Sequence, residues 1–226
     1  MKTDSQLQRD VLDQLEWEPS IREAEIGAAV KEGVVTLSGY VDTFAEKCAT
    51  IRAVERLNGV KAVADDLEVK LPSSHVRSDT DIAHAAVRAL DWDVQVPHDK
   101  IKMTVRDGWV TLGGDAEWQY QQSAAERAVR FLTGVIGVTN LIAVKPRHAS
   151  SFDVSGKIHE ALRRTAELDA GRITVEAHDG NITLNGTVRS YAERRDAERA
   201  AWGAPGVTNV DDRIAVTMCA GATTPP

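Results

Sequence analysis

One short phrase occurs three times in this chain, and it constrains the fold more than any other feature. It reads acidic residue, Gly, any residue, β-branched residue, Thr, Leu, any residue, Gly, and its copies span 32–39, 107–114 and 179–186. Twenty residues after its second glycine, each copy has a Gly-Val pair, so three glycines recur in register: Gly33, Gly39 and Gly59; Gly108, Gly114 and Gly134; Gly180, Gly186 and Gly206. Such a repeat predicts tandem copies of one structural unit.

The segment before each phrase predicts a helix followed by a strand. Apolar residues recur there at i, i+4 and i+8, which places them on one face of a helix; the first set is Leu7, Val11 and Leu15. Strict alternation follows, as in Ile26, Ala28 and Val30, and period two is typical of a strand with one buried face.

The phrase itself predicts a hairpin and a second strand. Gly33, Gly108 and Gly180 suit tight turns because glycine adopts positive φ at low cost. An Ala-rich second helix should follow and end at Gly59, Gly134 and Gly206 as C-caps, before a last strand. The sequence thus predicts an α+β fold of three tandem αββαβ modules, each a small three-stranded mixed sheet with two helices packed on one face. The predicted modules are residues 1–71, 72–147 and 148–218, with a disordered tail at 219–226.

Charge and hydropathy narrow the classes of partner. The net charge is −7 and no polybasic run is present, which disfavours nucleic acid as a partner. No stretch approaches the roughly 18 consecutive apolar residues of a membrane-spanning helix. The polar start has no apolar signal-peptide core, so we expect a cytoplasmic protein, or a periplasmic one if a leader was removed.

The sequence shows no catalytic, cofactor-binding or metal-binding constellation. Its six histidines lack the i, i+4 spacing of paired metal ligands on a helix, and the phosphate-binding G-x-G-x-x-G pattern is missing. We therefore predict no cofactor and no enzyme activity. Acidic pairs in the last strands of the first and third copies, Asp65-Asp66 and Asp211-Asp212, leave a cation site open as an alternative, although neighbouring strand residues point to opposite faces.

The tryptophans are the least expected residues of the repeat. Trp17 and Trp92 occupy equivalent positions, sixteen residues before the hairpin glycine, which favours a shared packing role after the first helix. Trp109 falls at the middle hairpin and should face away from the core. With Trp118 and Tyr120 it is a candidate interaction surface, unless a neighbouring module covers that face.

The repeated phrase, the charged Ala-rich helix and the Gly-Val strand together resemble the BON-domain family. Three copies in one chain are similar to the osmotically inducible protein Y group within it, over about residues 4–218. The resemblance implies a non-enzymatic, stress-associated scaffold that self-associates or binds envelope or client proteins. One alternative is a phospholipid-surface module that docks through the aromatic residues of the middle copy. A second alternative is a cation or small-ligand sensor.

Overall fold

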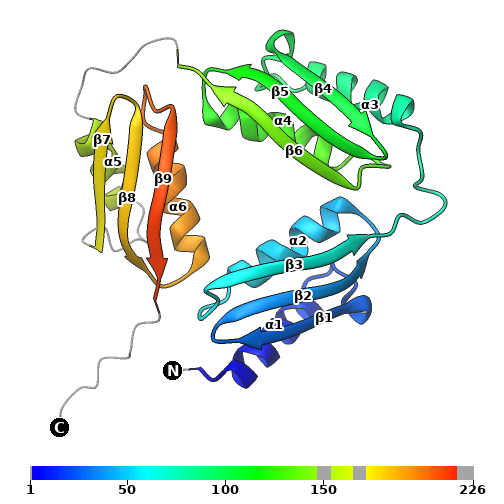
Figure 1. Ribbon diagram of the computed structural model, residues 1–226, viewed down its shortest axis with the longest axis horizontal. Coiled ribbons are helices and arrows are strands. Elements are labelled where there is room, and N and C mark those ends of the chain that lie inside the picture. The colour runs from blue at the N-terminus through cyan, green and yellow to red at the C-terminus, as the bar shows by residue number, and fades with distance from the viewer. Residues whose placement is uncertain (1, 147–153, 165–171, 218–226) are drawn as a thin grey trace.

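The computed structural model describes residues 2–146, 154–164 and 172–217 (Figure 1). The predicted tail at 219–226 lies outside these residues. Three modules follow one another along the chain. Module 1 contains α1 (Asp4–Trp17), β1 (Ile26–Lys31), β2 (Val34–Val41), α2 (Phe44–Glu55) and β3 (Ala62–Val69). Module 2 contains α3 (Asp79–Trp92), β4 (Ile101–Arg106), β5 (Trp109–Ala116), α4 (Gln119–Arg130) and β6 (Gly137–Val144). Module 3 contains α5 (Val154–Arg164), β7 (Ile173–His178), β8 (Asn181–Val188), α6 (Tyr191–Trp202) and β9 (Asn209–Val216).

Each module has the same mixed sheet. The middle strand pairs antiparallel with the strand before it and parallel with the last strand, which gives the orders β1-β2-β3, β4-β5-β6 and β7-β8-β9. In module 1, Val35 and Leu37 of the middle strand are fully buried against Val11 of α1 and Val54 of α2. Both helices therefore cover one face of the sheet, and the predicted α+β fold of three αββαβ modules is confirmed.

The hairpin turns form as predicted. In the first one, Glu32 and Gly33 have φ values of 55° and 82°, and such pairs of positive φ match the twist of a two-residue hairpin. The Asp4 carboxylate, at the start of α1, accepts hydrogen bonds from both backbone N–H groups, at 2.7 and 3.2 Å. Asp79 of α3 does the same in module 2, at 2.9 Å to each. The first helix of a module is thus fixed to its own hairpin.

The second glycine of the phrase lies where two backbones touch. A Cβ on Gly114 would stand 2.1 Å from the Lys100 carbonyl oxygen, and φ there is +117°. Gly39 and Gly186 have the same close approach, with corresponding distances of 2.0 and 2.1 Å. No side chain fits at these positions, which explains why the repeat keeps glycine there.

The third glycine does not end the second helix, so that part of the prediction was wrong. The helices end earlier and their C-caps are Arg56, Phe131 and Gly203. Gly59 follows in a separate turn with φ of 108°, as do Gly134 and Gly206 with 96° and 85°. A Cβ on the hairpin glycine Gly33 would come within 3.1 Å of the Gly59 carbonyl oxygen. The turn after the helix therefore packs directly on the hairpin.

The three modules lie around a common centre, with α2, α4 and α6 on their inner sides (Figure 1). Within the residues that the structure describes, none of the helices is long and apolar enough to cross a membrane.

Candidate functional site

The three aromatic residues of the candidate surface do not form one patch. Trp109 opens β5, where its ring lies over Gly137 and its Nε1 donates to Thr139 Oγ1 at 2.8 Å. Trp118 and Tyr120 lie beyond the other end of this eight-residue strand, so roughly 20 Å or more separates them from Trp109 at about 3.3 Å per residue. The structure brings Trp118 and Tyr120 together and leaves Trp109 apart.

The sheet face that carries Trp109 is open to solvent. Trp109 is 47% exposed, and Leu141 on the adjacent strand β6 is 65% exposed. No other module covers these two side chains within the described chain. The alternative in which a neighbouring module buries this face is therefore wrong.

The packing role predicted for Trp17 and Trp92 was also wrong. The two side chains are 83% and 88% exposed. The reason is helical geometry: Trp17 comes two positions after the buried Leu15, which is about 200° around the helix and so on the side away from the core. Carboxylates flank both indoles, in the sequences Leu15-Glu16-Trp17-Glu18 and Leu90-Asp91-Trp92-Asp93. Modules 1 and 2 thus each present one exposed indole between two acidic residues, called here an acidic, aromatic knob: Glu16-Trp17-Glu18 and Asp91-Trp92-Asp93.

One carboxylate of each acidic strand pair forms an ion pair within its own module. Asp65 Oδ2 lies 3.0 Å from Lys47 Nζ, and Asp212 Oδ2 lies 2.6 Å from Arg194 Nε. Burial alone would lower the pKa of Arg194, but its hydrogen bond and ion pair with Asp212 raise that pKa overall. Each of these carboxylates therefore joins the second helix of its module to the sheet.

The strand registers show that the two acidic pairs do not occupy equivalent positions in the repeat. Asp65 pairs with Leu37 and Asp212 pairs with the equivalent Leu184, so the two acidic pairs are offset by one residue. No group of three or more His, Cys, Asp or Glu side chains suited to a metal ion occurs among the described residues. The geometry gives the cation alternative no support.

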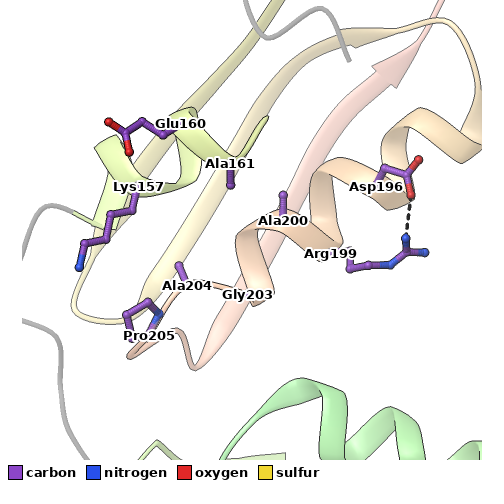
Figure 2. A pocket seen from close by; sticks show the side chains of 9 residues that line it. All are labelled: Lys157, Glu160, Ala161, Asp196, Arg199, Ala200, Gly203, Ala204 and Pro205. Carbon is purple, nitrogen blue, oxygen red and sulfur yellow. Dashed lines mark hydrogen bonds and ion pairs between the residues drawn. The ribbon is translucent and has the colours of Figure 1, made fainter. Parts of the chain in front are cut away.

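A groove of about 690 Å³ separates α5 from α6 in module 3 (Figure 2). Ala204 lines it, at the position where modules 1 and 2 have the larger Leu57 and Leu132, which pack on their cores. Small residues form its floor, whereas Lys157 and Glu160 point away on one side and Asp196 and Arg199 pair on the other (Figure 2). Among the described residues that line the groove, these charges do not converge on a common point.

The contacts between modules follow a cyclic pattern. Phe44, the first residue of α2, packs on the core of module 2, and the equivalent Tyr191 of α6 packs on the core of module 1. Trp118 and Tyr120 of module 2 share a cavity with Trp202 of module 3. Module 1 thus contacts module 2, module 2 contacts module 3, and module 3 contacts module 1.

One ion pair supports this cycle. Arg195 Nη1 of α6 lies 2.7 Å from Glu55 Oε2 of α2. The backbones of different modules approach only sparsely, so side chains make the junctions. Sequence reasoning missed these residues, although two aromatic residues at the same repeat position, Phe44 and Tyr191, were a visible signal.

Comparison with known families settles what these modules are. The model of the BON domain matches residues 3–70, 78–146 and 150–218, nearly the whole chain. The chain belongs to the BON-domain family. The BON modules are similar to the osmotically-inducible protein Y of Escherichia coli (strain K12), with 29% identity over 130 residues, which is 56% of this chain and 65% of that protein. The match therefore spans less than two thirds of that relative.

Two solved structures give weaker likenesses. One is of CdsD, a structural protein of the type III secretion system of Chlamydia trachomatis, at 15% identity, with 96% of this chain and 98% of that chain covered and a TM-score of 0.26. The other is of the C-terminal domain of CdsD, at 14% identity, with 92% and 96% covered and the same TM-score of 0.26. TM-scores this low carry no argument about the fold or function of the three BON modules.

Proposed function

We propose that this chain is a non-enzymatic, stress-associated protein that binds partner proteins through Trp17 and Trp92. The observation that carries the proposal is the exposure of these two indoles at equivalent positions of modules 1 and 2. Large aromatic side chains are enriched at protein interfaces, where they contribute much of the binding energy. The link to stress rests on the family and on the name of its osmotically inducible member.

The charges around each indole favour a basic partner segment. Glu16 and Glu18 flank Trp17 in the sequence, and Asp91 and Asp93 flank Trp92. A Lys or Arg side chain can lie over an indole ring and pair with an adjacent carboxylate, so the ring and the charge attract the same group. The occupant that fits both knobs is therefore a Lys/Arg-rich segment of another protein.

The same carboxylates disfavour an anionic membrane. Acidic phospholipids attract basic segments and repel acidic ones. The indoles alone suit a headgroup region, so lipid binding is the competing outcome of the test.

The test is binding of a short Lys/Arg-rich peptide, measured by fluorescence anisotropy beside a peptide of equal length with Glu at the basic positions. We expect binding of the basic peptide only, with a loss of about tenfold or more in the Trp17→Ala/Trp92→Ala double variant. Trp118→Ala is the control, because that indole stands outside both knobs. Equal binding by the double variant would refute the proposal.

Two further measurements separate the competing functions. Flotation with vesicles of neutral and anionic phospholipid would favour the lipid alternative if binding occurred and the double variant abolished it. Light scattering across a concentration range tests self-association. A defined oligomer that the double variant dissociates would make a second copy of this chain the partner.

A further inference from the structure

A cavity of about 710 Å³ lies where α2, α4 and α6 meet. Its wall contains residues from all three modules, so it exists only when the modules are together. Six arginines line it: Arg52 and Arg56 from module 1, Arg127 and Arg130 from module 2, and Arg195 and Arg199 from module 3. The volume is that of a small-molecule site.

Three of these arginines are equivalent in the repeat. Arg52, Arg127 and Arg199 each follow their hairpin glycine by nineteen residues and lie in the last turn of α2, α4 and α6. A positively charged residue in the last turn stabilises any helix, because it interacts favourably with the helix dipole. This effect explains why each helix has an arginine there. It does not require that three such residues converge on one cavity, as they do here.

The positive charge in the cavity is only partly neutralised. Arg195, Arg130 and Arg199 pair with carboxylates, namely Glu55 at 2.7 Å, Glu126 at 2.6 Å and Asp196 at 3.0 Å. Glu198 is the acidic residue among those that line the wall. Counting it with the three ion-pair partners sets four carboxylates against six arginines, a local balance of about +2 in a chain whose net charge is −7.

The other three arginines of the cavity have no acidic partner among the described residues. Arg52 Nε donates to the Cys48 carbonyl at 3.0 Å, and an Nη of Arg127 donates to Gln95 Oε1 at 2.9 Å. Among the described residues, Arg52, Arg56 and Arg127 form no ion pair. In addition, Arg130 Nε is buried without a hydrogen-bond acceptor in the described chain, and a buried charged donor in that position is costly. These donors and the unneutralised charge favour a ligand with negative charge.

We propose that the cavity binds a small anion with a chain of phosphate groups, held by Arg52, Arg127 and Arg199 together. Guanidinium groups match phosphate oxygens in pairs of parallel hydrogen bonds, and several phosphates in one ligand can reach arginines on three helices. Tyr120 and Trp202 at the wall offer a surface for a nucleobase. The ligand would also bridge the three modules, which otherwise meet through few side chains.

The test is isothermal titration calorimetry of the full chain with tripolyphosphate and, separately, with ATP. We expect one site per chain. Replacing one arginine, as in Arg127→Gln, should weaken binding about tenfold, and the triple variant Arg52→Gln/Arg127→Gln/Arg199→Gln should lose measurable binding. The matched control is Arg9→Gln/Arg88→Gln/Arg106→Gln, which changes the net charge equally at exposed residues outside the cavity.

The two ligands distinguish the source of the phosphate chain. Tighter binding of ATP, reduced to that of tripolyphosphate by Trp202→Ala, would indicate a nucleotide, whereas equal binding would indicate an inorganic chain. Thermal unfolding gives a second readout, since the ligand should raise the Tm of the wild type and of the control but not of the cavity variant. Equal loss of binding in the two triple variants, or several weak sites per chain, would overturn the proposal.

Discussion

Replacing Phe44 by Ala should open the junction between modules 1 and 2 without unfolding either module. Phe44 begins α2 but packs, half-buried, on the core of module 2. A phenylalanine buries about 200 Å² when fully covered, so half of that area at about 25 cal/mol/Å² is roughly 2.5 kcal/mol. The Ala that remains and the contacts with its own module reduce this to about 1–2 kcal/mol, which is a roughly 5- to 30-fold rise in the opened state.

The thiol of Cys48 reports on that opening. Cys48 lies on the side of α2 near Arg130 and Glu126 of module 2, whose charges act on its ionisation. In a Cys219→Ser background, Phe44→Ala should speed alkylation of Cys48 by up to the factor above while the far-ultraviolet circular dichroism stays unchanged. Phe131→Ala is the control, since that side chain is 60% exposed. Equal alkylation rates in the two variants would refute the packing of Phe44 at the junction between modules 1 and 2.

Three other changes test the fold. Gly114→Ala should lower the free energy of unfolding in urea by about 3 kcal/mol or more, because a Cβ there stands 2.1 Å from the Lys100 carbonyl oxygen. In the control Gly113→Ala the new Cβ meets nothing within 4 Å, so the free energy of unfolding should change by less than about 1 kcal/mol. Similar losses in the two variants would contradict the close approach. Asp79→Asn should cost about 1 kcal/mol, since it weakens two hydrogen bonds to the hairpin, and unchanged urea unfolding would count against this contact. Burial raises the pKa of the Cys48 thiol, so its contribution to stability is full below the ordinary thiol pKa and is lost as the pH rises above it. In the single-cysteine background, Cys48 should therefore be alkylated more slowly than a free thiol near pH 8. An equal rate would contradict the shift.

The sequence predicted the modules well because the strongest signals in it are local. Positive φ at Gly33 and the alternation along β1 depend on neighbours within a few residues, so a repeat of glycines and apolar residues specifies the hairpin and sheet register. The end of α2 was predicted less well. The chain leaves the helix at Arg56 and then makes a separate turn, whose glycine serves the contact with the hairpin.

The contacts and surfaces beyond one module were harder to predict. The exposure of Trp17 could have been predicted, because the apolar stripe that ends at Leu15 already places Trp17 about 200° around the helix from the core. The equivalent arginines, such as Arg127, were present in the repeat at a fixed spacing. Their meeting depends on how three modules pack, and no period in the sequence encodes that arrangement.

Because few side chains join the modules, their assembly depends on the covalent linkers between them. Nine residues, 70–78, connect β3 to α3, so module 2 is held near module 1 at an effective concentration of the order of millimolar. Contacts as small as that of Phe44 form readily under this condition and would rarely form between separate molecules. The modules produced as three separate chains should therefore fold without assembling, and the central cavity would be a property of their covalent connection.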